Sequence, residues 1–141
     1  MNEIGIQAVP NWNGASVQAE GRFSFPFWWE PIALRLLLVT DATVANRLCM
    51  VDLFSLEAGV NFTAFLRSVA GGAFAVAAST SRQIMLVREL AETAEDAVIQ
   101  AVQGQLAPLV IAPDMRLRVS IVDIQVTDTV SNVRLFYRRL S

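Results

Sequence analysis

The stretch Met115-Arg116-Leu117-Arg118-Val119-Ser120-Ile121-Val122 is the clearest indicator of the fold class. Apolar residues occupy every second position up to Ile121, with arginine or serine between them, and this is the period of a strand with one buried face. After Ile121 the apolar set changes phase and continues from Val122 to Val126. A shift by one residue inverts the faces of a strand, so we expect a bulge or bend near Ile121-Val122 that turns the chain from one sheet to another.

The same two-residue period occurs in residues 131–140 and 32–39. Turn residues separate such segments at intervals of roughly 8–15 residues, and no segment has the pattern of a convincing long helix. Residues 89–103 fit either a helix or a loop followed by a strand. The pattern predicts an all-β fold, an antiparallel β-sandwich of about eight strands that is jelly-roll-like.

The first 21 residues differ from the rest in composition. They are polar, rich in Asn, Gly and Ala, and contain Pro10 and the turn signal Asn11-Trp12-Asn13-Gly14. We predict an extended N-terminal arm over residues 1–21 and a β-sandwich domain over residues 22–141. The arm also carries side chains that favour burial, so we expect it to dock on a neighbouring subunit; they are Ile4, Ile6, Val9, Trp12 and Val17.

The composition indicates that the protein associates with other protein. Hydrophobic residues make up 54% of the 141 residues and charged residues 17%, against about 45–50% and about 25% in ordinary soluble domains. We expect neither a membrane span nor a secretory signal, because no apolar run has the required length or flanks. Another protein must then cover the surplus apolar surface, and we predict an obligate oligomer, a dimer or a trimer.

The charged residues exclude many kinds of chemistry. All eleven basic residues are arginine, histidine and lysine are absent, and the net charge is −2. Without histidine there is no Ser-His-Asp or Cys-His machinery, and without lysine there is no Schiff base or P-loop. We predict no enzyme activity, no catalytic residues, no cofactor, no metal site, no small-molecule substrate and no nucleic-acid partner. Arginine alone reflects either a GC-rich coding sequence or the use of planar, bidentate pairs at interfaces.

Two features could still carry chemistry. The acidic cluster of Glu89, Glu92, Glu95 and Asp96 could perform acid–base work or bind Ca²⁺, but a solvated loop or helix face is the preferred interpretation. The single cysteine, Cys49, lies in an apolar string and fits a small core residue.

The densest aromatic string runs from Phe23 to Trp29, with five aromatics in seven residues. Such side chains dominate both cores and interfaces, so a lid over the core and a subunit interface are both open, with a sugar-binding platform as a weaker alternative. As large aromatic anchors are typical of interface hot spots, we predict interface roles for Trp12, Phe25, Phe27, Trp28 and Trp29.

Three strings are similar to those of small virion proteins of tailed bacteriophages. Residues 37–47, LLVTDATVANR, resemble that family's first hairpin, with a "TTDATVANR"-like turn. Residues 108–118, PLVIAPDMRLR, resemble its "PLVLPPGxRLR" landmark, and residues 124–135, IQVTDTVSNVRL, resemble its closing hairpin. Two departures affect turns, since Asp114 replaces the usual glycine and Val126-Thr127-Asp128 replaces the usual "AGD".

The resemblance covers residues 30–140 and implies a jelly-roll-like virion component, assembled in the host bacterial cytoplasm. We expect a capsid decoration (cement) protein whose partners are copies of itself and the major capsid protein or other virion subunits. A tail, baseplate or neck component is the first alternative, and a carbohydrate-binding β-sandwich is the second. Head or tail location, symmetry, partner, host, and the division of apolar faces between core and interface stay open.

Overall fold

The structure is a computed structural model that describes residues 3–55, 64–67, 76–88, 93–96, 101–106 and 108–140. The described residues form eleven strands and no helix, so none of them belongs to a helix that could cross a membrane. The strands are β1 (Ile4–Ala8), β2 (Trp12–Asn13), β3 (Glu20–Phe23), β4 (Trp29–Val39), β5 (Leu48–Ser55), β6 (Ala64–Arg67), β7 (Ser81–Arg88), β8 (Thr93–Asp96), β9 (Ala101–Leu106), β10 (Met115–Val122) and β11 (Thr129–Arg139).

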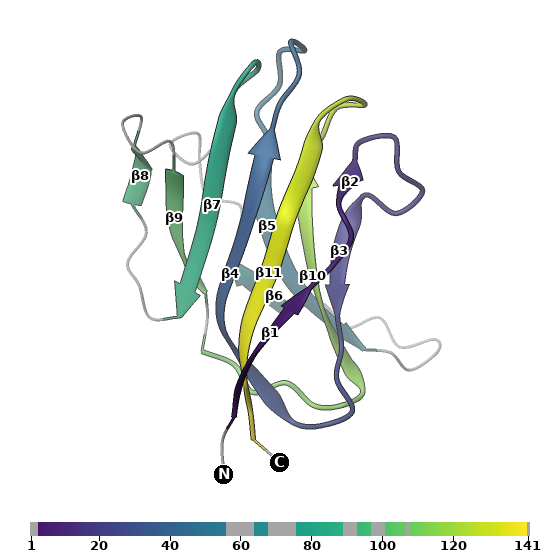
Figure 1. Ribbon diagram of the computed structural model, residues 1–141, viewed down its shortest axis with the longest axis vertical. Coiled ribbons are helices and arrows are strands. Elements are labelled where there is room, and N and C mark those ends of the chain that lie inside the picture. Colours follow the sequence, from purple (N-terminus) through teal and green to yellow (C-terminus); the bar gives the residue numbers. More distant parts are fainter. Residues whose placement is uncertain are drawn as a thin grey trace.

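Two sheets pack face to face (Figure 1). The larger has the order β1-β11-β4-β7-β9-β8, with β2 also paired to β11, and the smaller has the order β3-β10-β5-β6. All pairs are antiparallel except β7 with β9. Four strands of the larger sheet, β1-β11-β4-β7, and the four of the smaller follow the strand order of a jelly roll, in which the chain crosses repeatedly between sheets. The predicted all-β sandwich of about eight strands is therefore confirmed.

The core lies between the sheets and follows the two-residue period of the strands. In β4, Leu34, Leu36 and Leu38 are each at most 1% exposed, whereas Arg35, which lies between the first two, and Val39, which follows the third, face outward. Burying one such aliphatic side chain contributes about 1.5–3 kcal/mol, so these rows hold the sheets together. The other strands supply matching rows, namely Val130, Val133 and Leu135, then Leu117, Val119 and Ile121, and then Cys49, Val51 and Leu53.

The segment predicted as an N-terminal arm lies along this chain's own sandwich over its described residues. Strand β1 pairs with β11, and the Arg139 N–H donates to the Glu3 carbonyl at 2.8 Å. A Cβ at Gly5 would lie 2.5 Å from the Tyr137 ring, so a larger residue there would displace that ring. Strand β3 spans the predicted boundary at residue 21. Docking on a neighbour stays a prediction for the outward side chains Ile4 and Ile6, which are 64% and 60% exposed.

The expected bend lies just after Val122. Strand β10 pairs with β5 in unbroken register from Met115 to Val122, and the chain then turns at Asp123, whose φ is 58°, and crosses to the larger sheet. An irregular register occurs instead in β11, between Ser131 and Arg134. Strands β8 and β9 show that residues 89–103 include strand structure; Glu89 and Glu92 of the acidic cluster lie outside the described residues.

Candidate functional site

The sandwich has two distinct ends (Figure 1). One end, called the base here, holds both chain termini and the connections 24–28 and 108–114. The opposite end, called the loop end, holds the connections 14–18, 40–47 and 123–128. Because the aromatic string lies at the base and two of the three strings of the phage resemblance, residues 37–47 and 124–135, meet at the loop end, each end is a candidate site.

Four rings form an aromatic cluster at the base: Phe25, Phe27, Trp29 and Tyr137. The Phe25 centroid lies 5.1 Å from that of Phe27, 4.3 Å from that of Tyr137 and 4.9 Å from that of Trp29, which it meets edge-on. The Arg139 guanidinium lies 4.5 Å from the Phe27 centroid. Such ring pairs are worth about 0.5–1.5 kcal/mol beyond their burial, so the cluster adds to the stability of the base.

The five predicted interface residues differ in burial. Trp29 is fully buried and exchanges backbone hydrogen bonds of 3.0 and 2.7 Å with Ile111, and Trp12 is only 5% exposed, so both pack inside this chain. Phe25 and Phe27 are half-buried, and Trp28 is 48% exposed. An interface role stays a prediction, and the accessible ring surface belongs mainly to Phe25, Phe27 and Trp28.

At the loop end, three charged side chains form what we call the clasp: Asp41, Arg47 and Asp128. Arg47 is fully buried. Its Nε donates to Asp128 Oδ2 at 2.8 Å, and its Nη2 donates to Asp128 Oδ1 at 3.1 Å and to Asp41 Oδ1 at 2.9 Å. Its Nη1 donates to the Ala45 carbonyl at 3.0 Å. A buried charge is tolerated only when paired and hydrogen-bonded, and the clasp meets both conditions.

Backbone groups complete the clasp. Asp128 accepts hydrogen bonds of 2.7 Å from the Asp41 and Gln125 N–H groups. Burial raises the pKa of Asp128, but the bonds from Arg47 and these backbone groups outweigh it, so this pKa lies below its ordinary value. A hydrogen bond from the Thr127 hydroxyl, with further bonds from Thr43, lowers the pKa of Asp41 to about 2.

The 14–18 connection packs directly against the clasp. The Gly14 N–H donates to the Asp128 carbonyl at 3.3 Å, and a Cβ at Gly14 would lie 2.0 Å from the Gln125 carbonyl oxygen. Three connections are therefore locked together, and each presents one outward valine. Val17, Val44 and Val126 are 104%, 94% and 66% exposed.

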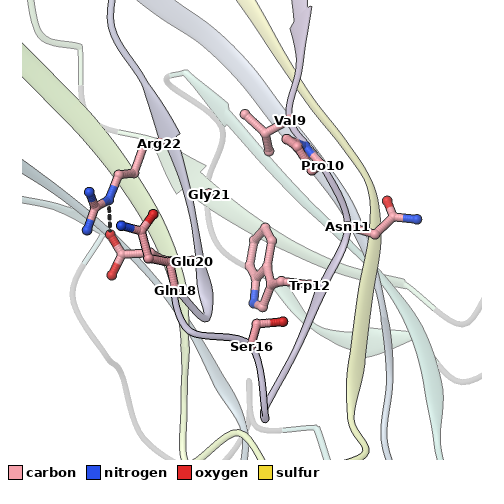
Figure 2. Close-up of a pocket in the computed structure, with 9 residues that line it drawn as sticks. All are labelled: Val9, Pro10, Asn11, Trp12, Ser16, Gln18, Glu20, Gly21 and Arg22. Atoms are coloured by element: carbon pink, nitrogen blue, oxygen red, sulfur yellow. Dashed lines mark hydrogen bonds and ion pairs between the residues drawn. The ribbon is translucent and has the colours of Figure 1, made fainter.

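A pocket of about 330 Å³ opens on one side of the sandwich, where β2 faces β3 (Figure 2). Its polar lining residues include Asn11, Gln18 and the ion pair of Glu20 with Arg22, whose atoms are 2.6 Å apart. Its single aromatic, Trp12, is buried, and the Trp12 Nε1 atom is shielded and has no hydrogen-bond partner. A sugar platform needs an exposed ring face, which this pocket does not offer.

The clasp was not predicted from the sequence as a site. Its only signal was that Asp41, Arg47 and Asp128 belong to strings of the phage resemblance, and Arg47 and Asp128 are separated by 81 positions. Across the part of the chain that is described, no three His, Cys, Asp or Glu residues are grouped so as to hold a metal ion.

Fold and site together define a jelly-roll β-sandwich with an aromatic cluster at its base and a buried ion pair between Arg47 and Asp128 at its loop end. A comparison with protein-family models, with curated proteins and with solved structures finds no match.

Proposed function

We propose that this protein is a structural component of a tailed-phage particle, a capsid decoration protein that binds outside the head shell. The observation that carries the proposal is the meeting of two resembling strings in the clasp. Asp41 and Arg47 come from the first string and Asp128 comes from the third. The resemblance thus includes side chains that hold the loop end together. Strings that resembled the family only by chance would have no reason to bring such side chains into contact.

The second resembling string also has a definite place in the fold. Residues 108–118 contain Ile111, which bridges to Trp29 at the base, and then enter β10. Jelly rolls occur in viral capsid and lectin domains. Fold alone is an analogy, and the proposal therefore rests on the strings and their positions.

The mechanism would be mechanical. Large apolar side chains are exposed on the base and on β1, where Trp28 is 48%, Val110 51% and Ile4 64% exposed. Contacts made by such residues with capsid subunits, or with other copies of this chain, stabilise the assembled shell by mass action, because only assembled subunits present the binding surface.

The test is a binding assay with head shells of the encoding phage that lack this protein. Purified protein is mixed with the shells, and the amount that sediments with them measures binding. The shells are then heated, and their disruption is followed by light scattering. We expect saturable binding and a higher disruption temperature. Trp28→Ala should weaken binding at least about tenfold, the loss typical of an interface anchor, while Val44→Ala at the loop end should bind like the wild type.

The assay also separates the proposal from its alternatives. If wild-type protein fails to bind shells but labels tails, baseplates or necks in electron micrographs, the decoration role is rejected in favour of a tail-side component. If it binds a glycan array and no particle, the carbohydrate-binding alternative replaces both.

A further inference from the structure

The outer face of the larger sheet holds two arginines directly opposite each other. Arg134 of β11 pairs in register with Arg35 of β4, and both lie on the face turned away from the core, since their neighbours Leu34 and Leu135 are buried. Arg35 is exposed and Arg134 is half-buried. Directly opposed residues have Cβ atoms roughly 4.5–5.5 Å apart, so the two side chains leave the sheet side by side.

This pair has no counter-ion among the described residues. Neither the Arg35 side chain nor the Arg134 side chain makes a hydrogen bond or ion pair within that part of the chain. The neighbouring acid, Glu30, is already held by Arg88 at 2.6 Å and by Arg138 at 2.7 Å. Like charges placed directly opposite each other destabilise a sheet. The pair therefore does not stabilise the fold, and a role in binding another molecule accounts for it better.

The backbone beside the pair is irregular in a way that shapes a small hollow. The register of β11 shifts between Ser131 and Arg134, and Asn132 has a φ of 54°. A hollow of about 100 Å³ lies there, lined by Arg35, Leu37, Gln83 and Asn132 together with Leu36. Bulges re-aim side chains and are frequent next to binding sites. The amide-bearing residues Gln83 and Asn132 thus line the hollow together with Arg35, and the hollow has room for a small polar group such as a carboxylate.

An apolar row borders the pair. In-register pairing places Ile6, Phe136, Ala33 and Val87 in one line across β1, β11, β4 and β7. The next line, parallel to it, is Ala8, Arg134, Arg35 and Met85. The face therefore has positive charge directly against apolar surface, an arrangement that fits an interface with a protein.

We propose that Arg35 and Arg134 form a docking point for a carboxylate of a protein partner, an Asp or Glu side chain flanked by apolar residues. Charge complementarity selects the occupant: the pair supplies two planar guanidinium groups that have no counter-ion among the described residues, and these match a carboxylate in a bidentate manner. If the protein is a decoration protein, as proposed above, this carboxylate belongs to a capsid subunit. Only that identity of the partner rests on the proposed function.

A first experiment does not depend on phage shells. The protein contains eleven arginines, and their Nε–H groups give ¹⁵N signals that are separate from those of the backbone, the tryptophan indoles and the glutamine amides. The capped peptide Val-Glu-Val-Glu-Val is titrated, with Val-Gln-Val-Gln-Val as its uncharged control. We expect the Arg35 and Arg134 signals to shift and saturate with the Glu peptide only. A larger shift with inorganic phosphate would overturn the assignment to a carboxylate, as would no shift with the Glu peptide.

A second experiment uses variants in the shell assay. The double variant Arg35→Gln/Arg134→Gln should lose binding at least about tenfold, as expected for an anchor, with a Tm equal to or above that of the wild type. The double variant Arg22→Gln/Arg116→Gln makes the same charge change on the smaller sheet and should bind normally. Equal binding by both double variants would overturn the docking point while leaving the decoration role intact.

The two experiments fail separately. If the peptide shifts the arginine signals but wild-type protein binds no shells, the decoration role fails and the carboxylate docking point stands. A different result would be that sedimentation shows the wild type to be a dimer or trimer and the Arg35→Gln/Arg134→Gln variant to be a monomer. The carboxylate then belongs to a second copy of this chain, and the proposed separate partner is rejected.

Discussion

The clasp at the loop end and the arginine pair on the outer sheet face use the same residue type in opposite ways. Arg47 is fully buried and donates hydrogen bonds to two carboxylates and a backbone carbonyl. Arg35 and Arg134 face outward side by side, and their side chains have no hydrogen-bond or ion-pair partner within the described residues. Arg47 stabilises this chain, whereas the side chains of Arg35 and Arg134 are available to a binding partner.

The difference teaches that burial and register decide what an arginine does. Removing one partner of a buried ion pair leaves a charge that water cannot reach, whereas an exposed charge is solvated and contributes little to stability. Variants at the clasp should therefore unfold the protein, and variants at the outer pair should change only binding. Four predictions follow this comparison, from the largest expected effect to the smallest.

Asp128→Ala should lower the free energy of unfolding by about 3–5 kcal/mol, because the buried Arg47 charge loses both hydrogen bonds to Asp128 and keeps only Asp41 as its counter-ion. Urea unfolding followed by fluorescence measures the loss. Asp128→Asn keeps the shape and part of the hydrogen bonding and should lose less. A loss under about 1 kcal/mol for the alanine variant, the level of an exposed ion pair, would show that the clasp does not hold the loop end.

The neighbouring tryptophans at the base repeat the comparison with aromatic side chains. Trp29→Ala should cost about 3–5 kcal/mol of stability, because Trp29 is fully buried. Trp28→Ala should stay within about 1 kcal/mol, because half of that side chain is exposed. Thermal unfolding of both variants gives the ratio. Equal losses would mean that Trp28 is also part of the core and unsuitable as a binding probe.

Acid should weaken the clasp and leave the outer pair charged. The folded-state pKa values of Asp41 and Asp128 lie below their ordinary values, that of Asp41 at about 2. The folded chain then binds fewer protons than the unfolded chain, so the contribution is complete above about pH 4 and is lost as the pH falls towards about 2. Tm measured from pH 6 to pH 2 should fall in this window, and less steeply for Asp41→Asn. Identical curves would exclude the clasp as the cause.

Arg134→Gln should have the smallest effect, a change within about 0.5 kcal/mol in the stabilising direction, because it removes a like-charge neighbour of Arg35 on the surface. Arg47→Gln is the matched variant, with the same change in charge and a large loss of stability. Differential scanning calorimetry of both variants tests the contrast. A clear destabilisation by Arg134→Gln would show that this arginine supports the fold.

Alternating residues allowed the strands and the sandwich to be predicted, because one buried face leaves a two-residue period in β4, β10 and β11. The clasp could not be predicted, since Arg47 and Asp128 are 81 positions apart and meet only after both sheets form. The outer pair depends on the register of β4 and β11, which shifts near Asn132. The sequence does not distinguish Trp28 from Trp29, because both are tryptophan. Strand β4 begins at Trp29, and the Trp29 side chain is the one that points into the core.

The pairing of β1 with β11 also has a consequence for synthesis. Strand β1 leaves the ribosome more than a hundred residues before β11, the strand it pairs with. Its contacts require closure of a very long loop, so its docking is expected to be a late and slow step of folding. Until then the edge of Ile4–Ala8 is open to other nascent chains. A chain that stops before β11 should therefore aggregate.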